Sequence, residues 1–301
     1  MMPCLRTPAS TSALQTLRQR YQTALHNFTA SSKPFGVLDT ITPPLPPSTK
    51  PVTLFVLDSS FNPPTRAHLR IAKSALLSRH HNDLSTSRLL LLLATQNADK
   101  PSKPALFEDR LVMMNMFAHD LQDAILSTVA TDDVGNTGYM SPPIDIGVTK
   151  LPYFIHKAVA ISSSGTYPAD LEQVHLTGYD TLIRIFDPKY YPPEHTLGPL
   201  APFLKQHRLR VTLRPDDEWG GSEEQRRFLV DLASGTMERI GGKREWAERI
   251  EIVEGTKEGE EVVSSTKARR EAGKGNGEAL GNLVTNRVRD WVLAEAPYRD
   301  G

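Results

Sequence analysis

The chain alternates between short apolar runs and segments with helical spacing over most of its length. Residues 52–57 form an almost continuous apolar run that ends at Asp58, and residues 88–94 form a second one. Such runs are typical of strands buried on both faces of a parallel sheet. Further strands are predicted at 124–131, 173–176, 208–213 and 250–253, and helices at 14–28, 65–77, 107–119, 150–161, 222–233, 265–272 and 282–293.

This alternation predicts an α/β fold, a Rossmann-like parallel sheet with helices on both faces. We expect residues 1–50 to form an N-terminal helix and a Pro-rich linker, and residues 51–301 to form a single domain. Residues 132–150 contain Gly, Pro, Asn and Ser and are expected to form a long loop. Because ligands bind at the carboxyl ends of strands in such sheets, motifs that directly follow strands are the candidates for chemistry.

Composition narrows the classes of partner. Basic and acidic residues number 35 each, so the formal net charge is zero and no overall basic field indicates nucleic acid. Cys4 is the only cysteine, which excludes a disulfide framework and fits a reducing compartment. No apolar run is long enough to cross a bilayer. We therefore expect a cytoplasmic or nuclear protein that binds neither nucleic acid nor membrane.

The N-terminal segment supports two interpretations. Residues 1–38 contain no acidic residue and many Ser and Thr, a composition typical of a mitochondrial transit peptide. Leu17, Tyr21, Leu25 and Phe28 recur at helical spacing, which predicts a helix packed on the domain. We favour the packed helix, and a mitochondrial location stays the alternative.

A first motif, Ser-Ser-Phe-Asn-Pro-Pro-Thr-Arg-Ala-His at residues 59–68, directly follows the first strand. Pro63 and Pro64 bar helix before Thr65, because proline disfavours helical backbone in the residue ahead of it. Thr65 is then a good N-cap, and His68 lies three residues on, on the same helical face. Since first-turn amides are unpaired and the helix dipole is positive there, this hydroxyl, imidazole and amide cluster predicts a phosphate site.

A second motif, Val-Ser-Ser-Thr-Lys-Ala-Arg at residues 263–269, follows the last predicted strand and opens another helix. Ser265 is a natural N-cap for this helix. Arg269 lies four residues further, one turn along the same face. Hydroxyls, free amides and a guanidinium again predict a site for one anion.

Together these motifs resemble those of the nucleotidyltransferase superfamily that carries a (H/T)xxH motif. The stretch from Phe61 to His68 matches that motif, with Ser59 where the superfamily usually has Gly, and Thr65 is similar to eukaryotic, fungal-type nicotinamide-nucleotide adenylyltransferases. Residues 263–269 resemble the Ile-Ser-Ser-Thr-x-Ile/Val-Arg motif. The resemblance implies that residues 51–301 form a nucleotidyltransferase domain, which transfers AMP from ATP to nicotinamide mononucleotide and releases NAD and pyrophosphate.

The resemblance also implies which residues carry this reaction. The expected catalytic residues are His68, Thr65 and Arg269. The residues expected to contact ATP, besides His68 and Arg269, are Ser60, Phe61, Gly178, Asp180, Ser265, Thr266 and Lys267. The residues expected to contact the acceptor are Ser60, Phe61, Tyr191 and a basic residue, either Lys100 or Lys103. A carboxylate just after a strand, as at Asp180, is a common partner of ribose hydroxyls.

Mg²⁺ is expected to accompany ATP as part of the substrate, and no protein ligand is assigned to it. Two alternatives stay open: the same chemistry with another acceptor, such as nicotinic acid mononucleotide, and a nucleotide-binding regulatory module without turnover. A dinucleotide-binding dehydrogenase is disfavoured, because no Gly-x-Gly-x-x-Gly follows the first strand. The oligomeric state is not fixed by the sequence, and a homo-oligomer stays an open alternative.

Overall fold

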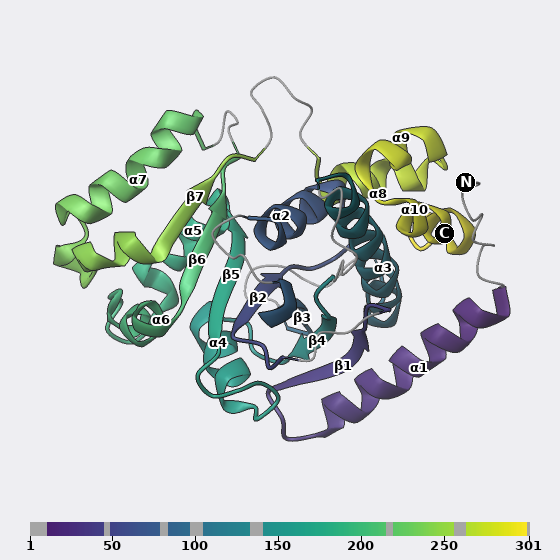
Figure 1. Ribbon diagram of the computed structural model, residues 1–301, viewed down its shortest axis with the longest axis horizontal. Helices are drawn as coiled ribbons and strands as arrows, with labels where there is room; N and C mark the ends of the chain where they lie inside the picture. Colours follow the sequence, from purple (N-terminus) through teal and green to yellow (C-terminus); the bar gives the residue numbers. More distant parts are fainter. Residues whose placement is uncertain are drawn as a thin grey trace.

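A computed structural model describes residues 11–44, 49–78, 84–96, 105–132, 141–214, 219–255 and 263–299 (Figure 1). The strands are β1 (Phe35–Ile41), β2 (Thr53–Asp58), β3 (Ser87–Ala94), β4 (Ile144–Thr149), β5 (Glu172–Gly178), β6 (Arg208–Thr212) and β7 (Ile250–Val253). The α-helices are α1 (Thr11–Ala30), α2 (Arg66–Leu76), α3 (Phe107–Asp132), α4 (Phe154–Ser163), α5 (Tyr179–Ile185), α6 (Ala201–Gln206), α7 (Ser222–Ser234), α8 (Ser265–Gly273), α9 (Gly277–Leu283) and α10 (Asn286–Glu295).

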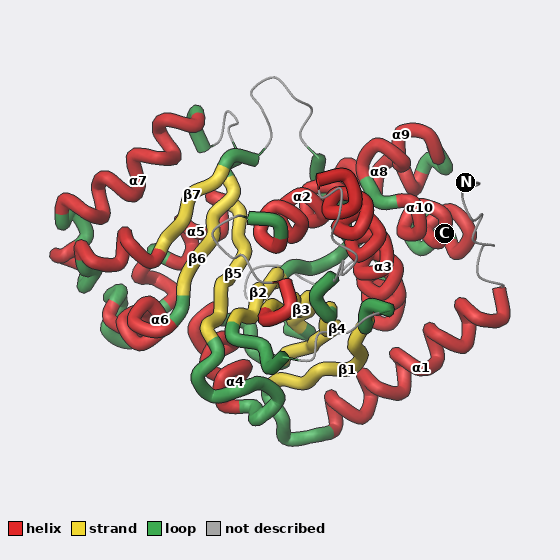
Figure 2. The backbone as a smooth tube through the Cα atoms, in the orientation of Figure 1, coloured by secondary structure: helices red, strands yellow, loops and turns green. Residues whose placement is uncertain are grey.

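The strands form one seven-stranded sheet in the order β1-β4-β3-β2-β5-β6-β7. All neighbouring pairs are parallel except β1, which runs antiparallel to β4 at one edge. Figure 2 shows the strands at the centre with helices around them. The predicted α/β fold is therefore confirmed, with the addition of one antiparallel edge strand. The division into two segments at residue 50 stays a prediction, although β1 lies before it and is part of this sheet.

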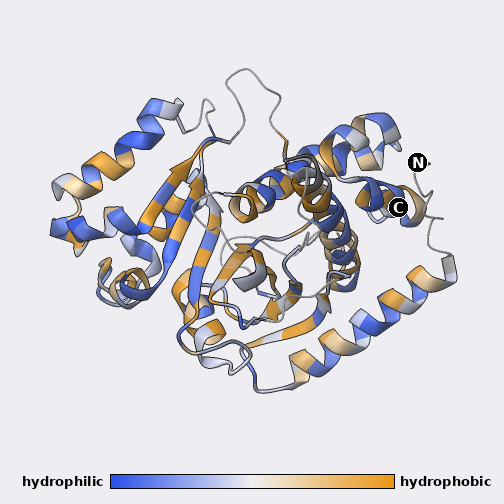
Figure 3. Ribbon diagram, in the orientation of Figure 1, coloured by the Kyte–Doolittle hydropathy of each residue, from blue (hydrophilic) through white to orange (hydrophobic). Residues whose placement is uncertain are grey.

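Side chains of the central strands divide between two hydrophobic cores with a period of two, as a pleated strand requires. On β2, Phe55 and Leu57 pack on one side with α1, α2, α3 and the C-terminal helices α8–α10. Leu54 and Val56 pack on the opposite side against α4. Figure 3 shows the apolar character of these central strands. A third core joins β6 to α5, α6 and α7. Helices thus cover both faces, and the central strands are apolar because neither face meets water.

Two adjoining segments differ from the prediction. Residues 124–131, predicted as a strand, continue the helix α3. Leu121 and Ile125 are buried one helical turn apart, which extends the apolar face of the helix. Thr128 donates its hydroxyl hydrogen bond to the carbonyl of Ala124 at 2.9 Å, which satisfies this side chain within the helix. The β-branched residues of this segment therefore do not indicate a strand here.

The second difference is β4, which lies within the predicted loop at 132–150, while residues 133–140 are outside the described residues. Every residue of β4 is buried, including Asp145 and Gly147. A Cβ at Gly147 would lie 2.6 Å from Cδ1 of Leu90, so glycine is required by the close approach of the neighbouring side chain. Gly147, one of the residues that suggested a loop, thus has a packing role in a buried strand.

The first and last described helices pack on the core of the sheet. The predicted N-terminal helix is confirmed as α1, with Tyr21 and Phe28 buried against the core. The single helix predicted at 282–293 is instead two helices, because Thr285 is the N-cap at which α10 begins after α9 has ended. No helix in the described ranges is long and apolar enough to cross a membrane.

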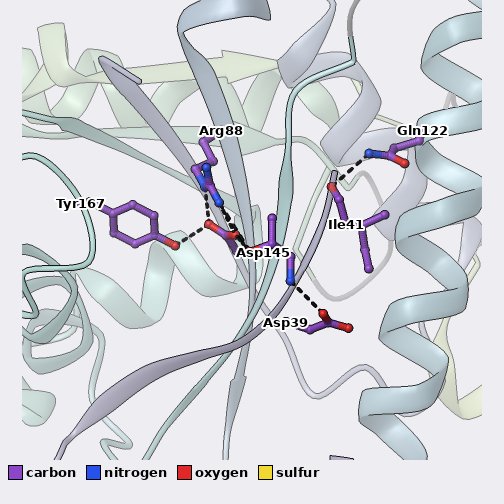
Figure 4. Close-up of polar contacts among 7 residues, drawn as sticks. Asp39, Ile41, Arg88, Gln122, Asp145 and Tyr167 are labelled. Atoms are coloured by element: carbon purple, nitrogen blue, oxygen red, sulfur yellow. Dashed lines mark hydrogen bonds and ion pairs between the residues drawn. The ribbon is translucent and has the colours of Figure 1, made fainter. Parts of the chain in front are cut away.

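Asp145 is the centre of a polar cluster that joins β4 to β3, β1 and the segment after α4 (Figure 4). Its carboxylate is 1% exposed and accepts two hydrogen bonds from Arg88, at 2.5 and 2.7 Å. It also accepts hydrogen bonds from the hydroxyls of Thr40 at 2.6 Å and Tyr167 at 2.8 Å. Hydrogen bonding to Asp145 raises the pKa of Arg88. Four donors thus compensate the burial of this carboxylate.

We expect Asp145→Asn to lower the free energy of unfolding by about 3 kcal/mol, because removal of one partner from a buried pair leaves the other uncompensated. Urea unfolding of both proteins measures the difference. Glu254→Gln is a matched control, since Glu254 pairs with Arg226 on the exposed surface, and we expect a loss below about 1 kcal/mol. Equal losses for the two variants would contradict this account of the cluster.

Candidate active site

The described residues enclose a cavity of about 730 Å³ at the carboxyl ends of the central strands. Asp58, Gly178 and Thr212, which end β2, β5 and β6, are part of its lining. This volume lies within the range of small-molecule sites, and the position is the one that open parallel sheets use for ligands. Both predicted phosphate motifs contribute side chains to this cavity.

The first motif forms the turn from β2 into α2. Thr65 is the N-cap of α2 and is 1% exposed, as the sequence predicts. Phe61 has a φ of 44°, in the left-handed region that costs a non-glycine residue about 1 kcal/mol. Its side chain is fully buried, with the ring centroid 5.4 Å from that of His68. The buried ring of Phe61 thus packs against the imidazole of His68.

Hydrogen bonds determine which nitrogen of His68 carries the proton. The backbone N–H of Thr65 donates to Nδ1 at 2.9 Å, so Nδ1 is an acceptor. The proton of a neutral ring is then on Nε2, which lies 2.9 Å from Oγ of Ser59. Burial lowers the pKa of His68 to about 4, so the ring is neutral at pH 7. His68 is therefore a neutral residue of the cavity lining whose N–H is at Nε2.

The second motif lies beside the first, although more than 200 residues separate them in the sequence. Ser264, and not the predicted Ser265, is the N-cap of α8, because its side chain accepts a hydrogen bond from the backbone of Lys267. Ser265 is the first residue of the helix, and its hydroxyl donates to the carbonyl of Pro63 at 2.9 Å. Arg269 donates to the carbonyl of Asn62 at 2.8 Å. These contacts place the amino-terminal ends of α2 and α8 at one cavity.

Other predicted residues also line this cavity, namely Ser60, Gly178, Asp180, Tyr191 and Thr266. Gly178 is the N-cap of α5, and a Cβ at this position would lie 2.7 Å from Oδ1 of Asp180. Glycine therefore leaves room for the carboxylate to turn back over the start of the helix. The hydroxyl of Tyr191 donates to the carbonyl of Ile185 at 2.6 Å, so this hydroxyl already has a partner within the chain.

Two predicted residues, Phe61 and Lys267, are not brought into this group. The cavity lining does not include Phe61 or Lys267. The side chain of Phe61 is fully buried and packs against His68, so any contact with a ligand would involve the backbone of Phe61 alone. Lys100 and Lys103 lie outside the described residues.

The cavity is more basic than the chain as a whole. Among the described residues that line it, the cationic side chains are Arg70, Arg110, Lys157, Arg184, Arg214 and Arg269, and the carboxylates are Asp58 and Asp180. A chain with no net charge thus concentrates positive charge where polyphosphate would bind. Of these charged residues, the sequence motifs indicated only Arg269 and Asp180. A signal existed for Lys157, the only Lys, Arg, Asp or Glu in the apolar helix α4, and for Asp58, which ends a strand.

No group of three or more His, Cys, Asp or Glu side chains that could hold a metal occurs among the described residues. Mg²⁺ that arrives on ATP is held mainly by phosphate oxygens and water, and needs few protein ligands.

No family model matches the chain. A protein of Schizosaccharomyces pombe, described as "Putative nicotinamide mononucleotide adenylyltransferase", is 29% identical over 281 residues, which cover 93% of this chain and 98% of that protein. The chain is a homologue of that protein. The homology spans both phosphate motifs, since so little of either chain lies outside the match.

Solved structures also resemble this chain. One is Plasmodium falciparum nicotinic acid mononucleotide adenylyltransferase complexed with NaAD, with 11% identity, a TM-score of 0.42, and coverage of 82% of this chain and 97% of that chain. Another is the same enzyme complexed with APC, with 10% identity, a TM-score of 0.42, and coverage of 82% and 96%.

We expect stability to fall between pH 6.5 and pH 5 because of His175, a buried residue of the cavity lining. Burial lowers its pKa to about 3, so only the unfolded chain takes up this proton as the pH falls below 6.5. This linkage lowers the free energy of unfolding by about 2 kcal/mol at pH 5 relative to pH 7. His68 acts in the same direction.

Urea unfolding at the two pH values measures the effect. His175→Gln is expected to reduce the pH-dependent loss by most of that amount. His26→Gln removes an exposed histidine of α1 and is the control. An unchanged loss in His175→Gln would contradict a neutral buried imidazole.

Proposed function

We propose that this chain transfers the AMP half of ATP to nicotinamide mononucleotide, with NAD and pyrophosphate as products. The observation that carries the proposal is the convergence of two helix amino-terminal ends on one basic cavity. Unpaired amides and the positive end of the helix dipole make each of them an anion site. Two such sites suit a triphosphate and the phosphate of a second nucleotide. The sequence similarity to the S. pombe protein supports the same reaction.

The proposed step is a direct displacement at the α-phosphorus of ATP. An oxygen of the acceptor phosphate forms a bond to this phosphorus as the bond to the bridging oxygen breaks. The electron pair leaves with pyrophosphate, so charge and atoms balance without a covalent enzyme intermediate. Because the acceptor phosphate is already an anion, no general base is needed. Catalysis then depends on positioning and on stabilisation of the charge that builds in the transition state.

His68 contributes a hydrogen-bond donor in this proposal. Thr65 fixes its Nδ1 as an acceptor, so the proton is on Nε2, which contacts Oγ of Ser59 in the structure and which we assign to the phosphates of bound ATP. A neutral imidazole keeps this proton at every pH well above 4. The role of His68 is therefore charge stabilisation by a held proton, and Thr65 positions the ring.

Arg269 and the start of α8 are assigned to the leaving pyrophosphate. The guanidinium of Arg269 reaches both the carbonyl of Asn62 and, at 3.1 Å, the hydroxyl of Thr266. It is thus held at the boundary of the two motifs and lines the cavity. Mg²⁺ bound with ATP would neutralise further phosphate charge. Asp180, after β5, is placed to accept hydrogen bonds from ribose hydroxyls.

We expect purified protein with ATP, Mg²⁺ and nicotinamide mononucleotide to form NAD and pyrophosphate in equal amounts. Arg269→Ala should lower kcat/KM by roughly 10²- to 10³-fold, the cost of removing one preorganised donor to transition-state charge. Arg270→Ala is the matched control, because Arg270 is exposed, pairs with Glu271 and does not line the cavity. His68→Ala should lower kcat/KM by a similar factor.

The two products are measured separately, NAD by its absorbance after enzymatic reduction and pyrophosphate by a coupled assay. Formation of the acid analogue of NAD from nicotinic acid mononucleotide alone would move the acceptor assignment and keep the reaction. ATP binding without pyrophosphate release in the presence of either acceptor would overturn the proposal in favour of a regulatory nucleotide-binding module.

A further inference from the structure

Ser59 stands where the first motif usually has glycine, and it has no part in the proposed displacement. Its hydroxyl oxygen lies 2.9 Å from Nε2 of His68. The residue is half-buried and lines the cavity. A polar side chain is thus present beside the imidazole to which stabilisation of the phosphate charge is assigned, and its chemistry bears on how the nucleotide is bound.

The backbone fixes the position of this hydroxyl. The N–H of Ser59 donates to the carbonyl of Leu92 at 3.2 Å, which continues the pairing of β2 with β3 one residue beyond the end of β2. Because side chains alternate along a strand, Ser59 shares a side with Phe55 and Leu57, the side on which α2 packs. Both the hydroxyl and His68 are therefore held by regular elements, which position a site more precisely than loops do.

The direction of the hydrogen bond follows from the tautomer of His68. Nδ1 accepts from the backbone N–H of Thr65, so the ring proton is on Nε2 and is donated to Oγ of Ser59. The proton of the Ser59 hydroxyl must then point away from the imidazole. In the part of the chain that the structure describes, no other group is hydrogen-bonded to this hydroxyl. Its proton is therefore available to a ligand in the cavity that Ser59 lines.

A phosphate oxygen is the kind of acceptor that such a proton suits, because hydrogen bonds from a hydroxyl to an anionic oxygen are short and strong. We propose that Ser59 is a phosphate-binding residue, whose hydroxyl donates to a phosphate oxygen of the bound nucleotide in a direction set by His68. This inference rests on the proposed function and deepens it by adding a donor to the phosphate site. His68 keeps its assigned role, since one N–H can serve two acceptors.

The test measures calorimetrically how a non-hydrolysable ATP analogue binds with Mg²⁺. Ser59→Ala removes the hydroxyl, so the Kd should rise roughly 10- to 100-fold, as for the loss of a hydrogen bond to a charged group. Ser127→Ala is the matched control, because Ser127 is exposed on α3, donates to the carbonyl of Asp123 at 2.7 Å and does not line the cavity. The stoichiometry counts the folded sites, so a partly unfolded preparation does not imitate weaker binding.

A double-mutant cycle with His68→Ala tests whether the imidazole directs the hydroxyl. In the His68→Ala background, Ser59→Ala should raise the Kd less than roughly threefold, because nothing then orients the hydroxyl proton. Effects that multiply in full would overturn the inference. Nitrogen-15 NMR of the free protein, with the His68 signals assigned from His68→Ala, supplies a second readout: a proton on Nε2 supports the inference, and a proton on Nδ1 overturns it.

The outcome for the proposed function is read separately, from NAD formation by wild type. If wild type forms NAD and Ser59→Ala binds the analogue with wild-type affinity, the inference is overturned and the proposed function stands. If wild type forms no NAD, the proposed function fails and analogue binding still decides the inference. Weaker binding in Ser59→Ala then supports it, and unchanged affinity, or no binding by wild type, overturns it.

Discussion

The guanidinium of Arg269 and the hydroxyl of Ser265 hold the start of α8 against the backbone carbonyls of Asn62 and Pro63. This junction is the constraint on which the site depends, because it closes one cavity from two segments more than 200 residues apart. The C-terminal helices support it further: Tyr298 donates its hydroxyl hydrogen bond to the side chain of Asn62 at 2.9 Å, and Arg66 donates to the carbonyl of Gly281 at 2.9 Å. Separation of α8 from the β2–α2 turn would leave two unrelated helix ends.

The central part of the fold could be predicted because its physical cause is local. Strands buried on both faces must be apolar throughout, and β2 and β3 are. β4 could not be recognised in the same way, because Asp145 and Gly147 are explained only by residues distant in sequence. The buried charge of Asp145 is compensated by hydrogen bonds from Arg88, Thr40 and Tyr167. Glycine at position 147 leaves room for the side chain of Leu90. The same limit applies to residues 124–131, whose β-branched residues suggest a strand until α3 is seen to continue.

The site shows a similar division. Short motifs with capping chemistry placed Thr65, His68, Ser265 and Arg269 correctly beside one cavity, since a helix start is encoded within a few residues. The sequence pattern could not decide whether Ser264 or Ser265 is the N-cap, because adjacent serines are equivalent until the backbone direction is known. Lys267 lies within the second motif but is not part of the cavity lining. Asp58 and Lys157 were missed as a pair, since only the packing of α4 on β2 brings them within 2.5 Å.

The central claim is that the amino-terminal ends of α2 and α8 jointly bind the triphosphate of ATP. A crystal structure of the protein with Mg²⁺, a non-hydrolysable ATP analogue and nicotinamide mononucleotide tests it most directly. The account predicts the β- and γ-phosphates within hydrogen-bond distance of Arg269 and the first-turn amides of α8, with Nε2 of His68 facing the α-phosphate. A nucleotide bound elsewhere, or a triphosphate that contacts neither helix start, would contradict it.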